Sequence, residues 1–172
     1  MAKDSSYINK TAKYNVYLDG RRLIGLTDSI DLPELTVKTE DAEVAGGTIS
    51  VPIIGQFEAS ELTLNFQQLY GEIFDFVAFG QGVSLTFRIA NQTLSGDGNI
   101  EMAGTRVVIR GIPKSISPGS LKNGTSSNAS VTLSLTYYYM EENGEEKLSH
   151  DFLNGITRVN GRDQGAAVDA LI

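Results

Sequence analysis

The residues that could carry out chemistry are few. The chain has no cysteine and a single histidine, His150. The absence of thiols removes disulfides, thiol nucleophiles and cysteine-based zinc clusters. A Ser-His-Asp arrangement would have to use His150, but no G-x-S-x-G elbow occurs. Because His150 lies in a charged stretch near the C-terminus, we expect it to be a surface residue.

Carboxylates are more abundant, and paired carboxylates can act as acid and base in glycoside hydrolysis. One cluster surrounds the dipeptide at 143–144 and consists of Glu141, Glu142, Glu145 and Glu146. That dipeptide is Asn-Gly, which is typical of a tight hairpin turn, so these charges should be solvated. The stretch SGDGN at 95–99 lacks the ligand spacing and the final Glu of a calcium loop, and we interpret it as a turn.

Phosphate chemistry is equally unsupported. The sequence has neither a GxxxxGK[ST] loop nor a GxGxxG pattern opening a helix, and it has no tryptophan. The formal net charge of -7 disfavours tight nucleic-acid binding, which depends on lysine and arginine. No stretch is apolar enough for a signal peptide or a membrane span, so we expect an intracellular product. We expect no enzyme, no cofactor and no metal site.

The elements that would position any functional residues are mainly β-strands. A length of 172 residues suits one domain. Asp19-Gly20 predicts a hairpin turn between two apolar runs. Alternating patterns predict the strands 58–66, 83–90, 100–112, 129–140 and 147–152. A helical stripe of Leu69, Ile73, Phe76 and Val77 predicts one α-helix over about 67–79.

The segment 40–56 is acidic at its start, passes through Gly46-Gly47 and ends in an apolar run around Pro52. It could be a buried strand that follows a surface loop. It could equally be a glycine-hinged arm that buries its apolar side only against another subunit. The residues alone leave both alternatives open.

Two predicted strands carry hydroxyl residues on the face opposite the core. In 83–89 these are Ser84 and Thr86, and in 129–139 serine and threonine alternate with valine and leucine. Such a face suits a wetted surface that neither grips nor repels strongly. The simpler alternative is that Ser and Thr satisfy strand propensity on an exposed sheet.

The order of motifs resembles the major tail tube protein family of contractile-tailed bacteriophages and related phage-tail-like particles. The N-terminal half contributes NVYLDGRRLIG, SIDLPELTVKTEDAEVAGG and FEASELTLNF. The C-terminal half contributes VVIRGIPKSISPGSLKNGTSSNASVTLSLTYYYMEENGEE and DFLNGITRVNGRD. The resemblance covers nearly the whole chain. A longer N-terminal lead, a serine-rich linker around 117–128 and a short apolar C-terminus depart from the pattern.

The resemblance implies a single tail tube domain over 1–172, an antiparallel β-barrel or sandwich with one flanking α-helix and a long protruding β-hairpin arm over about 36–57. Six copies would form a ring, and rings would stack into a tube inside a contractile sheath. The arm would reach a neighbouring ring. Its candidate contact residues are Glu40, Asp41, Glu43, Val44, Gly46, Gly47, Ile49, Val51, Pro52, Ile53 and Ile54.

The resemblance also implies a location and partners. The protein would belong to the virion tail after assembly in the host cytoplasm, and would contact the sheath, tape measure, tail terminator and baseplate proteins but no membrane. Double-stranded DNA would pass through the lumen without specific binding, because a neutral or acidic hydroxyl-rich wall holds no phosphates. The candidate lumen residues are Glu58, Glu61, Thr63, Ser84, Thr86, Ser130, Thr132 and Ser134.

A second function of a different class is compatible with the residues. A monomeric β-sandwich adaptor or carbohydrate-binding module would explain the tyrosine-rich strand, with Tyr138 stacking on a sugar. Within the first interpretation, the sequence fits both a DNA-carrying phage and a headless tail-like killing device.

Overall fold

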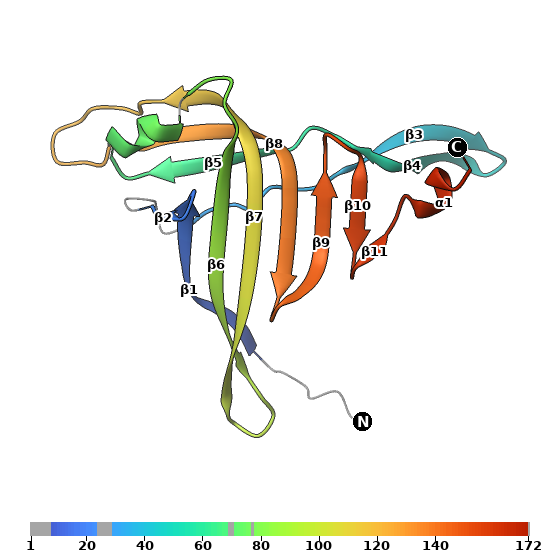
Figure 1. The fold of residues 1–172 in the computed structure, drawn as a ribbon, viewed down its shortest axis with the longest axis horizontal. Helices are drawn as coiled ribbons and strands as arrows, with labels where there is room; N and C mark the ends of the chain where they lie inside the picture. The colour runs from blue at the N-terminus through green and yellow to red at the C-terminus, as the bar shows by residue number, and fades with distance from the viewer. Residues whose placement is uncertain (1–7, 24–28, 69–70, 77, 172) are drawn as a thin grey trace.

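The computed structural model describes residues 8–23, 29–68, 71–76 and 78–171 (Figure 1). All strand pairs in it are antiparallel, which confirms the prediction of a mainly β fold. The elements in chain order are β1 (Ile8–Leu18), β2 (Arg21–Arg22), β3 (Val37–Val44), β4 (Gly47–Phe57), β5 (Glu61–Phe66), the 3-10 helix η1 (Gly71–Phe76), β6 (Val83–Leu94), β7 (Ile100–Ser117), β8 (Ala129–Glu142), β9 (Glu145–Asp151), β10 (Ile156–Val159), β11 (Arg162–Asp163) and α1 (Ala166–Asp169).

Nine of these strands form one sheet that folds over on itself. Its order is β11-β10-β9-β8-β7-β6-β1-β2, and β5 pairs separately with β8. The upper layer contains β5 and the first half of β8, and it lies across the top of the upright strands of the main sheet (Figure 1). No pairing among the described strands joins β2 to β11. The fold is therefore the sandwich-like alternative and not a closed barrel.

The strands β7 and β8 pass from the main sheet into the upper layer. Their pairing register shifts between Arg110 and Gly111, and again between Pro113 and Ser115. Bulges of this kind bend a strand and let it change sheets, which produces two layers at a steep angle. Both layers are therefore built from the same two long strands.

The hydrophobic core lies between the layers. Alternation in β5 buries Leu62, Leu64 and Phe66 and leaves the residues between them exposed. Each such side chain removed from water contributes about 1.5–3 kcal/mol. The other fully buried apolar side chains include Val16, Leu85, Phe87, Val107, Ile109, Val131 and Leu133. One core thus serves the upper layer and the main sheet, as expected for a single domain.

Three hairpins use the same two-residue turn. Both turn residues have positive φ at Asp19-Gly20 (45° and 86°), Asn143-Gly144 (49° and 83°) and Asn160-Gly161 (50° and 73°). This geometry matches the twist of the flanking strands, and Asn, Asp and Gly adopt it at low cost. The predicted hairpin at Asp19-Gly20 is confirmed.

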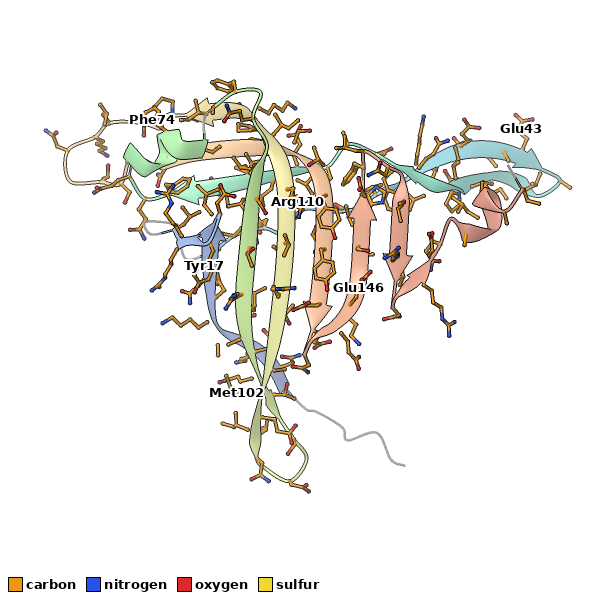
Figure 2. All side chains as sticks on the ribbon, viewed as in Figure 1. Tyr17, Glu43, Phe74, Met102, Arg110 and Glu146 are labelled. Atoms are coloured by element: carbon orange, nitrogen blue, oxygen red, sulfur yellow. The ribbon has the colours of Figure 1, made fainter. Side chains whose placement is uncertain are left out.

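The predicted α-helix over 67–79 is wrong. The described part of that segment forms the 3-10 helix η1, which places Ile73 in the core and leaves Phe74 exposed (Figure 2). Two other residues of the predicted stripe, Leu69 and Val77, lie outside the described residues. The 3-10 helix η1 spans only six residues, and 3-10 geometry is typical of such short helical pieces in connections between strands.

The crossing of β7 from one layer to the other depends on the absence of a side chain at Gly111. A Cβ there would lie 2.7 Å from the Ser134 carbonyl oxygen and 3.2 Å from the Leu133 Cβ. We predict that Gly111→Ala lowers the free energy of unfolding by about 1–3 kcal/mol, measured by urea denaturation. The matched control is Gly104→Ala in the same strand, where a Cβ meets nothing within 4 Å. An equal effect of both changes would contradict this account.

Candidate assembly surfaces

The paired strands β3 and β4 form a hairpin arm that extends from the body (Figure 1). All of the predicted arm residues lie on this hairpin or its turn. Directly paired residues share a face, so the register gives the arm two different sides. One side carries Ala42, Val44, Ile49 and Val51, with Glu40 beside Val51, and the other carries Thr39, Asp41, Glu43, Thr48, Ser50 and Pro52.

The apolar side of the arm is uncovered. Ile49 is 50 % exposed and Val51 is 42 % exposed. A two-stranded hairpin is at best marginally stable alone in water, so an exposed apolar side indicates a surface that another molecule covers. This rules out the buried-strand alternative within the isolated subunit. Gly46 and Gly47 lie at the tip turn, so the bend at the root is at Gly55, where φ is 81° and the register is irregular.

His150 lies at the root of the arm, and our prediction that it is a surface residue is wrong. His150 is only 2 % exposed, not a surface histidine. It lies on β9 directly opposite Tyr138, on the core side of the sheet. The Phe57 ring at the end of β4 contacts it at a centroid distance of 4.1 Å. The charged neighbours in sequence hid this burial because they alternate to the other face of the strand.

A second protrusion was not predicted. The β6–β7 ladder continues to Leu94 and Ile100, so β6 extends beyond its predicted end at residue 90, and the tip projects from the body (Figure 1). Ile100 is 66 % exposed and Met102 is 62 % exposed. Met102 and Glu43 mark the two separate protrusions in Figure 2.

The predicted lumen residues separate into two groups on different layers. Thr63 and Thr132 face each other across β5 and β8, with their hydroxyls 3.2 Å apart. Glu61 pairs with Ser134 in the same ladder and forms an ion pair with Lys114. Ser84 and Thr86 instead lie on the main sheet. Glu58 is exposed at the arm root, and Ser130 belongs to the β5–β8 group.

On the main sheet, Ser84 and Thr86 belong to a face that alternates with the buried core residues. Three of its arginines lie over tyrosine rings: Arg88 over Tyr17 at 5.4 Å, Arg106 over Tyr139 at 5.8 Å and Arg110 over Tyr137 at 5.1 Å. Cation–π contacts of this kind are worth about 0.5–1 kcal/mol at exposed sites. We call this set the arginine–tyrosine face.

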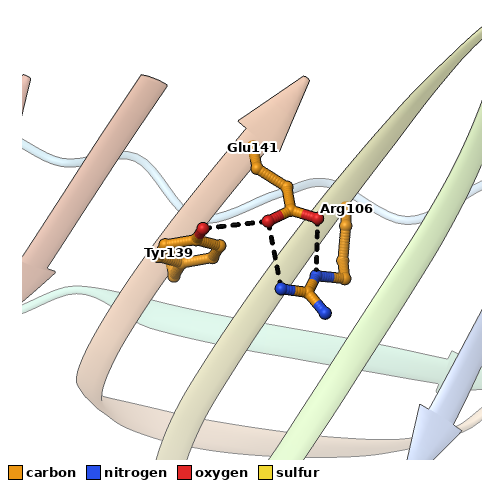
Figure 3. A network of polar contacts seen from close by, with 3 residues as sticks. All are labelled: Arg106, Tyr139 and Glu141. Atoms are coloured by element: carbon orange, nitrogen blue, oxygen red, sulfur yellow. Dashed lines mark hydrogen bonds and ion pairs between the residues drawn. The ribbon is translucent and has the colours of Figure 1, made fainter. Parts of the chain in front are cut away.

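Glu141 links two of these residues (Figure 3). Its carboxylate accepts from Arg106 at 2.9 and 3.0 Å and from the Tyr139 hydroxyl at 2.9 Å. The hydrogen bond to Glu141 raises the pKa of Tyr139, because the ionised phenol could not donate it. Glu146 and Asp151 on the neighbouring strand lie on the same face. The register also places the cations Lys13, Arg22 and Arg158 there. The carboxylates therefore compensate only part of the positive charge of the face.

The described residues also bear on metal binding, membrane spanning and carbohydrate binding. Within them, no group of three or more His, Asp or Glu side chains could hold a metal ion. No described helix is long and apolar enough to cross a membrane. Tyr138, which the carbohydrate-binding alternative required on the surface, is 5 % exposed and belongs to the core. That alternative is therefore wrong for this residue.

Comparison with known proteins decides the family. The profile described as phage tail tube protein FII matches residues 8–172. The chain belongs to this family of tail tube proteins. The tail tube protein of Escherichia phage P2 is 30 % identical over 155 residues, covering 87 % of this chain and 88 % of that protein. The major tail tube protein of Serratia phage KSP20 is 27 % identical, covering 90 % and 89 %.

Solved structures agree on the fold of this tail tube family member. A chain of the extended sheath–tube complex of the extracellular contractile injection system PVC superposes with a TM-score of 0.52 at 16 % identity, covering 80 % of this chain and 93 % of that one. A chain of the anti-feeding prophage cap gives a TM-score of 0.52 at 13 % identity, covering 82 % and 95 %. The predicted family is confirmed, and membership makes the chain a structural protein and not an enzyme.

The exposed side of the arm makes a direct prediction about stability. We expect Ile49→Thr with Val51→Thr to change the free energy of unfolding of the isolated subunit by less than about 0.5 kcal/mol, because neither side chain is packed. Leu133→Ala in the core should cost about 2–5 kcal/mol. Urea denaturation of dilute protein measures both. A large loss in the arm variant would mean that the apolar side packs within the subunit.

Proposed function

We propose that this tail tube protein forms hexameric rings that stack into a hollow tube inside a contractile sheath, through which double-stranded DNA passes. The observation that carries the proposal is the arm, whose apolar side is left exposed by the described part of the subunit. Family membership gives the arm a context, since a tube is built from many copies of one chain.

Identical subunits can cover such a surface in one specific way. An arm that binds a different site on a second copy makes a heterologous contact, which closes into a ring or continues as a stack. The arm and the distal β6–β7 tip extend from separate parts of the body (Figure 2). Two protrusions allow each copy to contact more than one neighbour. Every contact then repeats along the tube, and burial contributes roughly 25 cal/mol per Å2.

The tube would have several partners in the virion tail after assembly in the host cytoplasm. We propose a sheath protein around it, a tape measure protein within it during assembly, and a terminator and baseplate at its ends. The fold matches chains of a sheath–tube complex and of a tube-terminating cap, which supports this setting. The same setting accommodates a DNA-carrying phage and a headless particle.

We propose that the arginine–tyrosine face lines the lumen. It belongs to the wider layer, in which β1 and β6–β10 lie side by side. Arg88, Arg106 and Arg110 each lie over a tyrosine ring, and Glu141, Glu146 and Asp151 share the face with them. Arginines compensated in this way hold DNA phosphates less firmly than free cations do, which would lower the affinity of this wall for a moving duplex. Of the predicted lumen residues, this keeps Ser84 and Thr86 and places the β5–β8 group outside.

Removing the arm tests the assembly proposal. Deletion of Asp41–Ile54 should leave a folded, soluble subunit with unchanged circular dichroism that no longer forms tubes in negative-stain electron microscopy. A finer version replaces Ile49 and Val51 by Asp on the apolar side, with Thr48→Asp on the polar side as the matched control. We expect only the first variant to abolish tubes. Tubes from the deletion variant would refute the assigned role of the arm.

Charge changes on the two layers test the lumen assignment. Ser84→Lys with Thr86→Lys adds cations to the arginine–tyrosine face, and Thr63→Lys with Thr132→Lys adds the same charge to the upper layer. Both variants should still form tubes. We expect DNA release from phage carrying the first variant to slow at least tenfold, with stronger slowing at low salt. Slowing confined to the second variant would place the upper layer in the lumen instead.

A further inference from the structure

The arm and the body meet at a small aromatic cluster. Phe57, the last residue of β4, stacks on His150 at a centroid distance of 4.1 Å and an interplanar angle of 40°. Phe152 contacts the other side of the imidazole edge-on, at 4.3 Å and 78°. Gly55 lies two residues before Phe57, where the β3–β4 register is irregular. The exposed hairpin lies on the side of Gly55 away from the body. Phe57 therefore connects the arm root to the body at His150, beside the hydrogen bond from the Glu58 backbone N–H to the Thr36 carbonyl oxygen.

The imidazole in this cluster is neutral. Its Nδ1 lies 2.8 Å from the Thr157 hydroxyl on β10, and burial lowers the pKa of His150. The titratable groups nearby are Tyr138, opposite on β8, and Asp151, the next residue in the chain. The charge of Asp151 and a hydrogen bond with the Ile156 backbone oppose the effect of burial. Asp151 lies on the other face of the strand, where it accepts hydrogen bonds from the Leu153 backbone and Asn154.

We propose that His150 is a positioning residue that holds the arm root to the body while it is neutral and releases it when it is protonated. A charged imidazole at this buried position loses its hydration, and the neighbouring carboxylate of Asp151 lies on the other face of the strand. Moving Phe57 away would let water reach the ring, and Gly55 provides a point where the chain can turn. The consequence for assembly rests on the proposed function of the arm, whereas release of the arm root does not.

The sign of the pH dependence follows from the lowered pKa. The released state has a histidine of ordinary pKa, about 6.5, and binds a proton more readily than the docked state. Docking is therefore fully favoured above about pH 6.5. Below it, the ratio of docked to released arm falls about tenfold per pH unit until the docked histidine also titrates.

His150 is the only histidine in the chain, so its ring signals in NMR are unambiguous. We would titrate the dilute, monomeric subunit from pH 8 to pH 4.5 and follow these signals together with the amide signals of 48–57. We expect the imidazole to titrate below the ordinary value and the arm amides to shift with the same midpoint. Core amides in β6 and β7 serve as the internal control. Titration of His150 without any response in the arm would overturn the proposal.

The matched variant His150→Phe keeps an aromatic ring beside Phe57 but cannot be protonated. Its arm should stay docked at pH 5, so that hydrogen exchange of 48–57, corrected for intrinsic rates, loses its pH dependence. Asp151→Asn controls for the neighbouring carboxylate and should keep the dependence. A variant that releases its arm at low pH as the wild type does would also overturn the proposal.

Tube formation separates this inference from the proposed function. Wild-type protein should need about tenfold more subunit to form tubes at pH 5.5 than at pH 6.5, and His150→Phe should show no such change. If wild type forms no tubes at any pH while the NMR midpoints still coincide, the assembly proposal fails and the positioning role of His150 stands. If tubes form equally at all pH values and the arm amides do not respond, the positioning role fails alone.

Discussion

An apolar strand face is unfavourable in water until another surface covers it, and this constraint organises the whole subunit. The main sheet solves it internally, because β7 and β8 bend over at Gly111 and bring Leu133 and its neighbours onto the core. The apolar side of the arm stays exposed, because among the described strands β3 and β4 pair only with each other. The same physical effect therefore stabilises the body and leaves the arm requiring a second molecule.

The division between body and arm makes their junction important. Phe57 belongs to the arm by chain position, but its ring extends the core by contacting His150. Burial of a titratable group at this point connects the energetics of the body to the direction of the arm. The two strands of the arm are also joined at the root, where the Glu58 backbone N–H donates to the Thr36 carbonyl oxygen at 2.9 Å.

On the polar surface of the main sheet, arginine side chains are compensated by neighbouring carboxylates and tyrosine rings. Arg106 shares Glu141 with the Tyr139 hydroxyl, and Arg88 lies directly opposite Arg106 in the ladder. Like charges facing each other across strands are destabilising unless neighbours compensate. The tyrosine rings and carboxylates supply that compensation across adjacent strands. These compensating pairs are created only by the sheet register.

The sequence by itself determined the strand pattern and the turn dipeptides, because each depends on residue types close together in the chain. Alternation of period two identifies a strand and its two sides, and Asn-Gly or Asp-Gly identifies a turn. The order of motifs along the chain indicated the family, whereas the residues alone left the arm and a buried strand as equal alternatives. An apolar stripe predicted an α-helix where η1 forms, because such a stripe does not show whether a segment forms an α-helix or a short 3-10 helix.

Only the tertiary structure decided which residues from distant segments contact each other. It therefore also decided to which layer each polar strand face belongs. Periodicity could not place Ser84 and Thr63 on different layers, because the bulges of β7 and β8 turn one sheet into two. Nor could it show that His150 is buried by Phe57, which lies 93 residues earlier in the printed sequence. Contacts between distant segments depend on how the whole chain packs, and a local pattern carries no information about that packing.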